Sequence, residues 1–189
     1  MPAKTLAEYV ALAKKGGRYA NFASAAAGSL PHFFGLLFGK TAGLDLTHVP
    51  YKGSAQVVQA MMSNEIPAAV LSIADLGSLV QSGKGRILAT AGANRAPQFP
   101  DVPTFKESGY DIEGAAWYAL FAPAGTPRAI VDKIAAAGID AVRQPDLRQK
   151  IEPLGLEATG YGPDELATIL KSDDAKWGPV IRASGFKAD

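Results

Sequence analysis

A loop of small residues joins a short polar strand to an apolar helix near the start of the chain. This small-residue loop consists of Ser24, Ala25, Ala26, Ala27, Gly28 and Ser29. The first turn of a helix exposes backbone N–H groups that have no partner inside the helix, and the helix dipole adds partial positive charge there. Small side chains let an anion approach those groups closely. The sequence therefore predicts an anion site built mainly from backbone, with the hydroxyls of Ser24 and Ser29 as further donors.

The same stretch offers a serine and a histidine, which raises nucleophilic catalysis as an alternative. Ser29 lies three residues before His32, on the predicted helix. A hydrolase of the nucleophile-elbow type would show a Gly-x-Ser-x-Gly motif, which is absent, and no carboxylate nearby in sequence would orient the histidine. His32 equally suits a histidine at the edge of the core that bonds to backbone. We expect a ligand-binding protein rather than an enzyme, with His32 beside the ligand.

Two further strand-to-helix turns carry polar side chains. One contains Tyr51 and Ser54, and the next contains Ser72 and Asp75. Helix capping alone would explain any single turn of this kind. Ligands of open α/β sheets, however, bind outside the carboxyl ends of the strands, where all three turns would meet. The resulting polar rim suits a carboxylate better than a phosphate, because neither a P-loop lysine nor the glycine pattern of dinucleotide-binding folds is present.

Hydrophobic patterning places these turns in a regular alternation of strands and helices. Strands are predicted at residues 18–23, 44–50, 66–73 and 86–91, and helices at residues 5–14, 29–42, 54–63 and 75–82. Thr5 is expected to cap the first helix with Glu8 as its capping-box partner, and Ser54 to cap the third. Such an alternation indicates a parallel sheet with right-handed crossovers.

The rhythm changes after residue 93. Trp117 and Tyr118 fall on opposite faces of a predicted strand, so one is expected in the core and the other toward a cleft or solvent. Thr126 is expected to cap a helix that begins at Pro127, and Pro179 to break or kink the last helix. The predicted elements are a loop at 94–104, a helical turn at 104–108, strands at 115–122 and 156–159, and helices at 127–143, 144–154 and 163–184.

Composition excludes several classes of protein. Of the 189 residues, 48% are hydrophobic and 20% charged, which indicates a buried core rather than disorder. The net charge is +1 without a Lys/Arg cluster, so we expect no nucleic-acid partner. Cysteine is absent, and His32 and His48 are too far apart for a one-turn metal pair, so we expect no metal and no cofactor. His48 lies in a predicted strand, where a structural role is expected.

No apolar run is long enough to cross a bilayer, and the start of the chain does not read as a signal peptide.

An ordered set of short motifs resembles one known family. The motifs are Asn21–Ser24 with Gly28, Ser29 and His32, then His48–Gly53, Gly83-Lys84 with Arg86, Arg95, Pro100–Thr104, Trp117-Tyr118, Ala122–Pro127 and Trp177. Together they cover essentially the whole chain, in order and at the family's spacing. The sequence is similar to the substrate-binding proteins of tripartite tricarboxylate transporters, the Bug or TctC family.

The resemblance implies an α/β, type II periplasmic-binding-protein-like fold. The expected parts are a parallel-sheet second lobe plus the returning C-terminal part of the first lobe. Residues 1–114 would form the ligand-binding lobe, residues 115–126 a hinge strand and turn, and residues 127–189 the helical part of an incomplete first lobe. Most of the first lobe and the signal peptide are expected to be missing.

The resemblance also implies a function. Such receptors are periplasmic, hold small organic carboxylates mostly through backbone amides, and deliver them to a membrane permease. Closure of two lobes would bend the chain near residues 115–123. The candidate ligand-binding residues in this chain are Ser24, Ala25, Ala26, Ala27, Gly28, Ser29, His32, Tyr51, Ser72 and Asp75.

Two departures from the family pattern bear on affinity. The family more often has Ser, Gly or Asn where this chain has Ala25, Ala26 and Ala27, and Ser72 stands near a position that often carries an acidic or amide residue. Three alternatives therefore stay open: a ligand-sensing or interaction module without transport, a non-functional fragment, and a Ser/His hydrolase.

The C-terminal helices would lack the sheet on which they normally pack. Their apolar faces are marked by Ile130, Ile134, Leu147, Ile151 and Leu166. Large exposed apolar patches are rare in monomers. We therefore expect self-association, or partial disorder of residues 127–189.

Overall fold

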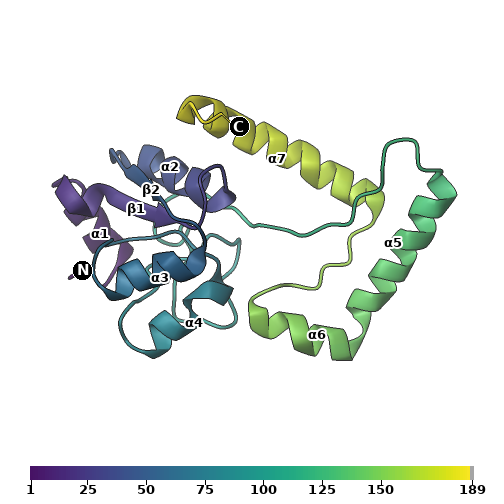
Figure 1. Ribbon diagram of the computed structural model, residues 1–189, viewed down its shortest axis with the longest axis horizontal. Coiled ribbons are helices and arrows are strands. Elements are labelled where there is room, and N and C mark those ends of the chain that lie inside the picture. The colour runs from purple at the N-terminus through teal and green to yellow at the C-terminus, as the bar shows by residue number, and fades with distance from the viewer. Residues whose placement is uncertain (188–189) are drawn as a thin grey trace. The chain divides into compact units, whose positions relative to one another are not determined.

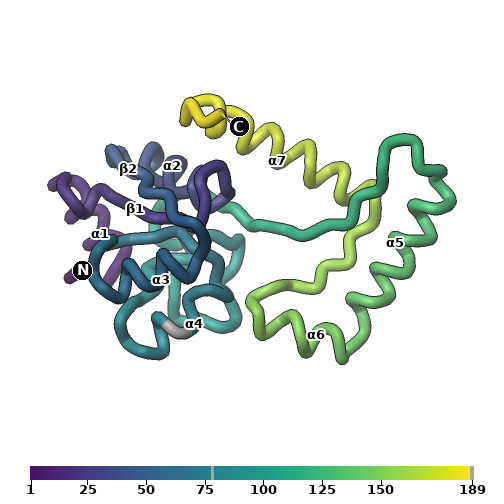
Figure 2. Tube along the Cα trace, in the orientation of Figure 1, coloured from purple at the N-terminus to yellow at the C-terminus, as the bar shows by residue number. Residues whose placement is uncertain are grey.

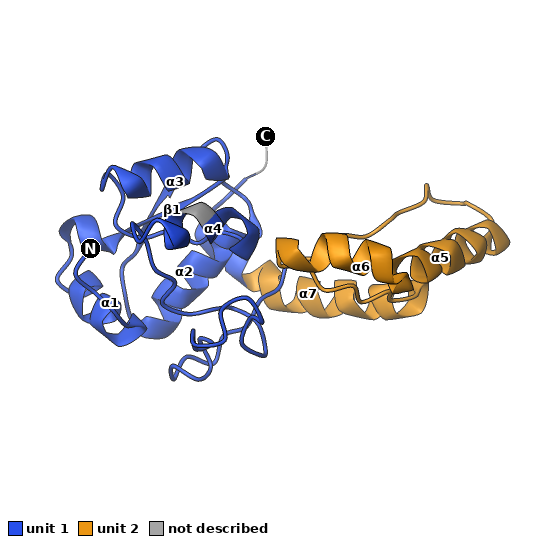
Figure 3. Ribbon diagram, turned by 90° about the horizontal axis from the view of Figure 1, so that it is seen from below, with its two compact units in different colours: residues 1–116, 180–189 blue, residues 117–179 orange. Residues whose placement is uncertain are grey.

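The computed structural model describes residues 1–187, except for the side chain of Ser78. The chain forms two compact units, residues 1–116 with 180–189 (unit 1) and residues 117–179 (unit 2), coloured separately in Figure 3. The helices labelled in Figure 1 are α1 Leu6–Ala13, α2 Leu30–Ala42, α3 Ser54–Met62, α4 Ile73–Gln81, α5 Arg128–Arg143, α6 Pro145–Ile151 and α7 Pro163–Ser184. Short 3-10 helices span Gly17–Ala20 and Glu152–Leu154.

A small parallel sheet positions the first two turns of the predicted rim. Strands β1 (Asn21–Ser24) and β2 (Thr47–Pro50) pair in parallel, with Ser24 opposite Pro50, and run side by side in Figure 2. Both are shorter than predicted. The 3-10 turn Gly17–Ala20 occupies the start of the first predicted strand, and the second begins only at Thr47.

The segment at residues 68–70 lies along the other edge of β1. The Ala23 N–H donates to the Ala68 carbonyl, and the Val70 N–H donates to the Ala23 carbonyl, each at 2.9 Å. Only one bridge, Ala23 to Ala69, connects the two segments, so residues 66–73 do not form the full strand that their apolar run predicts. The segments still alternate with helices as predicted, and β1 lies between β2 and residues 68–70.

Apolar burial attaches the helices to this sheet. A buried cluster of Ala23, Val57, Ala60 and Ile66 joins β1 to α3. On α2, Phe33, Phe34 and Phe38 are buried, as the periodicity predicts. The helix approaches β1 closely because Gly35 has no side chain, and a Cβ there would lie 2.1 Å from a Phe22 ring carbon.

Three further predicted strands form no ladder among the described residues. In residues 86–91, Thr90 makes a single bridge, to Thr104, and residues 115–122 and 156–159 make none. A strand requires a neighbour that takes up its N–H and C=O groups along its whole length, and these segments have only isolated contacts of this kind. The prediction that either Trp117 or Tyr118 lies in the core is also wrong, since their exposed fractions are 39% and 87%.

The helix caps agree with the sequence in part. The Glu8 N–H donates to Thr5 Oγ1, which confirms Thr5 as the cap of α1. Ser54 is instead the first helical residue, after Gly53 at the cap with a φ of 106°. Thr126 is not a cap either. Its hydroxyl donates to the Pro123 carbonyl, and Pro127 takes the cap position with extended backbone.

Unit 2 is helical and leaves large apolar side chains in solvent. Arg148 ties its turns together by donating to the Val142 and Ala158 carbonyls. Helix α7 spans the predicted residues Pro163–Ser184 and continues through Pro179, so the chain does not break there. The most exposed large apolar side chains of the unit are those of Tyr118, Leu120, Phe121, Ile130, Ile134, Leu154 and Tyr161.

Candidate functional site

The small-residue loop connects the carboxyl end of β1 to the start of α2. Ser29 is the N-cap of α2, and its hydroxyl oxygen accepts from the His32 N–H at 3.5 Å. The Ser29 and Ser24 hydroxyls both donate to the Ala26 carbonyl, at 2.7 and 3.0 Å. Both hydroxyls thus fold the loop back on itself, so the carbonyl of Ala26 is turned inward and held.

His32 is buried beneath the loop and bonds to its backbone. The Gly28 N–H donates to His32 Nδ1 at 3.1 Å. Because Nδ1 accepts, the proton of the neutral ring resides on Nε2. The imidazole therefore supports the loop from below, in the manner of a core-edge histidine, and the amide of Gly28 is already occupied.

His48 stacks on His32 and completes the support. The two ring centroids are 3.9 Å apart with planes 23° from parallel. His48 Nε2 lies 2.7 Å from Ser24 Oγ. Since the single Ser24 hydroxyl proton is directed to the Ala26 carbonyl, His48 Nε2 is the donor in this pair. Ser24 itself is fully buried.

Both imidazoles are neutral near pH 7. Burial lowers the pKa of His32. Burial, and then repulsion from His32, lower the pKa of His48 to about 4. Two stacked rings without charge fit this packing, because a proton on either would be poorly hydrated and would face its neighbour. An anion at the loop would therefore be held by amide dipoles and not by imidazolium charge.

The amides that remain are those of the loop's outer part. Within the described residues, the N–H groups of Ala25, Ala26, Ala27 and Ser29 donate to no other residue. The side chains of Ala26 and Ala27 are exposed. These amides precede the thirteen-residue helix α2, whose dipole favours negative charge at this end. The arrangement has the chemistry for a carboxylate.

The polar residues of the third turn form a separate cluster. Asp75 Oδ2 accepts from Ser54 Oγ at 2.7 Å and from Ser72 Oγ at 3.1 Å. The two hydroxyls thus link the start of α3 to the start of α4. They satisfy the Asp75 carboxylate and present no donor pair to a shared ligand.

Tyr51 contacts the small-residue loop through its backbone and directs its hydroxyl away from the loop, toward Glu65. Tyr51 Oη donates to Glu65 Oε1 at 2.9 Å, and burial and this bond raise the pKa of the phenol. Its backbone N–H donates to the Ser24 carbonyl at 3.1 Å, and the Gly53 N–H donates to the Ala25 carbonyl at 2.8 Å. The structure therefore brings the first two turns together through backbone.

Sequence reasoning missed two residues that support the loop. His48 has the structural role that its strand position predicts, but the sequence does not reveal that this role serves the loop, which His48 adjoins through its place opposite Phe22 in β2. The second residue is Phe186, whose ring lies against Gly28 and His32. No local pattern could reveal Phe186, because more than 150 residues separate it from the loop.

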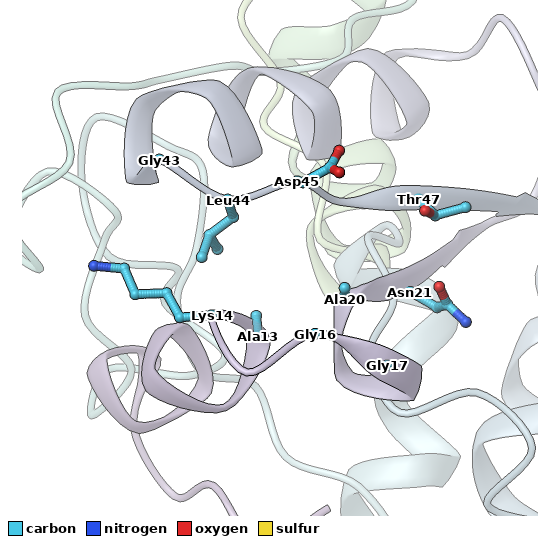
Figure 4. A pocket seen from close by; sticks show the side chains of 10 residues that line it. All are labelled: Ala13, Lys14, Gly16, Gly17, Ala20, Asn21, Gly43, Leu44, Asp45 and Thr47. Carbon is cyan, nitrogen blue, oxygen red and sulfur yellow. The ribbon is translucent and has the colours of Figure 1, made fainter.

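A pocket of about 460 Å³ lies at the opposite, amino end of the strands (Figure 4). Lys14, Asn21, Asp45 and Thr47 supply its polar side chains. It contains none of the predicted ligand-binding residues. The pocket is therefore distinct from the small-residue loop.

The described residues contain neither a candidate metal site nor a candidate membrane-spanning helix. No group of three or more His, Cys, Asp or Glu side chains in this part of the chain could hold a metal ion. Nor does the described chain contain a helix that is long and apolar enough to cross a membrane.

The family model that matches the chain is the tripartite tricarboxylate transporter family receptor, over residues 1–186. Among curated relatives, a UPF0065 protein of Cupriavidus necator is 33% identical over 98% of this chain and 56% of its own length. A UPF0065 protein of Pseudomonas sp. (strain P51) is 31% identical over 85% of this chain and 48% of its own length. BugT of Bordetella pertussis is 28% identical over 88% of this chain and 51% of its own length.

Solved structures agree with these relatives. A structure described as a periplasmic transporter has a TM-score of 0.86 and 29% identity over 100% of this chain and 63% of its own. Rpa4515 of R. palustris, solved with adipate, has a TM-score of 0.84 and 26% identity over 98% of this chain and 62% of its own. MatC of Rhodopseudomonas palustris, solved with malate, has a TM-score of 0.79 and 29% identity over 95% of this chain and 63% of its own.

These matches confirm the predicted family and the α/β fold with a parallel sheet. The chain spans about half the length of the first curated relatives it matches. The relatives are solute-binding receptors and not enzymes. In this chain, the Ser29 hydroxyl accepts from the backbone N–H of His32. The chain belongs to the tripartite tricarboxylate transporter receptor family.

Proposed function

We propose that this chain is the ligand-binding part of a periplasmic receptor for small organic carboxylates. The observation that carries the proposal is the row of unengaged amides at Ala25, Ala26, Ala27 and Ser29, in front of α2. One carboxylate of the ligand lies against these amides. The adipate and malate in two related structures support this class of ligand.

The side chains that the sequence singled out have unequal parts in this proposal. Ser24, Gly28, Ser29 and His32 shape the loop through their mutual hydrogen bonds. Ser72 and Asp75 hold the neighbouring turn together, and the backbone of Tyr51 secures the second turn to Ser24. They act by holding the amides in place, with ligand contact mainly through backbone.

Calorimetric titration with adipate and malate tests the proposal. Ala26 is exposed, and its hydrogen bonds to Ser24 and Ser29 use only its carbonyl, so a polar side chain fits there. In Ala26→Asp, the added carboxylate repels the ligand and weakens binding about tenfold or more. Ala26→Asn is the matched neutral control and retains binding. Equal affinity in the two variants would overturn the proposed site.

The wider role follows the family. The loaded receptor delivers its ligand to a membrane permease, and residues 115–123 bend when the lobes of a complete receptor close. These residues have the exposed, ladder-free backbone that a hinge needs. Comparing ligand uptake between cells with and without the chain would test the delivery step. Unchanged uptake would favour the ligand-sensing alternative.

Self-association is the last part of the proposal. In unit 2, Leu120 and Phe121 are 78% and 67% exposed, and Ile130 and Ile134 about half exposed. A second copy of the chain would cover these side chains and remove apolar surface from water. Light scattering of the purified chain should give a mass above that of one copy at micromolar concentration. A monodisperse monomer at all concentrations would contradict this part.

A further inference from the structure

The end of the chain folds against the start of α2. Helix α7 ends at Ser184, and Gly185 takes a left-handed backbone with a φ of 68°. The Phe186 N–H then donates to Ser184 Oγ at 3.2 Å, which closes the turn. This turn directs the Phe186 ring toward Gly28, within unit 1.

The Phe186 ring occupies the space that a side chain at residue 28 would need. A Cβ built on Gly28 would lie 2.4 Å from Phe186 Cζ. The ring also meets His32 edge-on, with centroids 6.1 Å apart and planes at 77°, and Phe33 in the same way at 5.7 Å and 76°. Edge-to-face packing of this kind is a favourable aromatic geometry.

Contacts continue from this ring to the loop that carries the amides. Gly28 bonds to His32 through its N–H, His32 stacks on His48, and His48 donates to Ser24. Ser24 in turn fixes the carbonyl of Ala26. The contacts thus run from Phe186 through Gly28, His32, His48 and Ser24 to Ala26, and each residue holds the next one in place.

From this series we infer that Phe186 is a positioning residue for the small-residue loop. Its ring confines Gly28 and the His32 imidazole from one side. The loop then keeps the conformation in which its outer amides face away from the chain's own acceptors. The effect on ligand affinity rests on the proposed function, whereas the effect on the loop does not.

Two measurements separate these effects. The first is made without ligand, by NMR, and follows hydrogen exchange of the Gly28 amide and the ring nitrogen shifts of His32. The second is calorimetric titration with adipate. The variants are Phe186→Ala, the conservative Phe186→Leu, and Lys187→Ala, which removes the exposed neighbouring side chain as a control.

In Phe186→Ala, Gly28 exchange should accelerate about two- to tenfold, the range that loss of aromatic pairs gives. The His32 ring shifts should move toward averaging of its tautomers, and adipate affinity should fall by a similar factor. Phe186→Leu should retain most of each property, and Lys187→Ala all of them.

The outcomes discriminate clearly. If Gly28 exchange and the His32 shifts in Phe186→Ala equal those of the unaltered protein, the inference is wrong. If they change but adipate affinity does not, Phe186 only packs against the loop and has no positioning role in binding. If the unaltered protein binds no adipate, malate or other carboxylate, the proposed function fails, and the ligand-free measurement still decides the effect of Phe186 on the loop.

Discussion

Stability should depend on pH through His48. The pKa of His48 is about 4 in the folded chain, against an ordinary value of 6.5. Below pH 6.5, the unfolded chain therefore takes up a proton that the folded chain refuses. The free energy of unfolding must then fall as the pH falls from about 6.5 toward 4.

The size of the loss follows from the two pKa values. Each pH unit inside this window corresponds to about 1.4 kcal/mol per group, so His48 alone would account for about 2 kcal/mol between pH 6.5 and 5. Its ring is only partly buried, and solvent screening reduces the figure to about 1 kcal/mol. The lowered pKa of His32 acts in the same direction.

Urea denaturation at pH 7 and pH 5 measures this loss. These two pH values cover the upper part of the window between the two His48 pKa values and keep most carboxylates ionised. His48→Gln is the matched variant, because a glutamine amide can still donate to Ser24 Oγ but does not titrate. The variant should lose about 1 kcal/mol less between pH 7 and 5 than the unaltered protein. Equal pH slopes in both proteins would refute the assigned burial and stacking of His48.

Substitutions at three other positions test the loop, the core and the cluster of Ser54, Ser72 and Asp75. Gly28→Ala places a Cβ against the Phe186 ring at a φ of 74°, so it should cost about 1–3 kcal/mol of stability and weaken carboxylate binding, as thermal denaturation with and without adipate would reveal. Val57→Ala in the fully buried cluster should cost about 2–3 kcal/mol in urea denaturation, and a loss under 0.5 kcal/mol would contradict the core assignment. Asp75→Ala leaves the Ser54 and Ser72 hydroxyls without their acceptor and should cost about 1–2 kcal/mol, whereas Asp75→Asn keeps one acceptor and should cost less.

Local patterns predicted the helices well because the signals are local. Thr5 with Glu8 marks the start of α1, and Gly43, with a left-handed φ of 63°, ends α2 where predicted. The apolar face of α2 is visible in the spacing of its phenylalanines. Caps that depend on tertiary partners are harder to predict. The Ser54 hydroxyl, for example, bonds to Asp75 in the next helix and not to its own helix.

Strands and the details of the site depend on contacts between distant residues. The apolar run at 66–73 has the composition of a strand, yet only Ala69 bridges to β1. The loop was correctly located on the strand-to-helix connection, but its support by His48 and Phe186 comes from residues far away in the sequence. A histidine at one end of a strand and an aromatic residue after the last helix carry no local signal for this role.

The central claim is that a carboxylate binds at the outer amides of the small-residue loop. Titration of the nitrogen-15 labelled chain with adipate, followed by amide NMR shifts, tests it most directly. If the ligand binds there, the shifts should be saturable and largest at Ala25, Ala26, Ala27 and Ser29. Saturable shifts centred on Lys14 and Thr47 at the opposite pocket, or no saturable shift with any carboxylate, would contradict it.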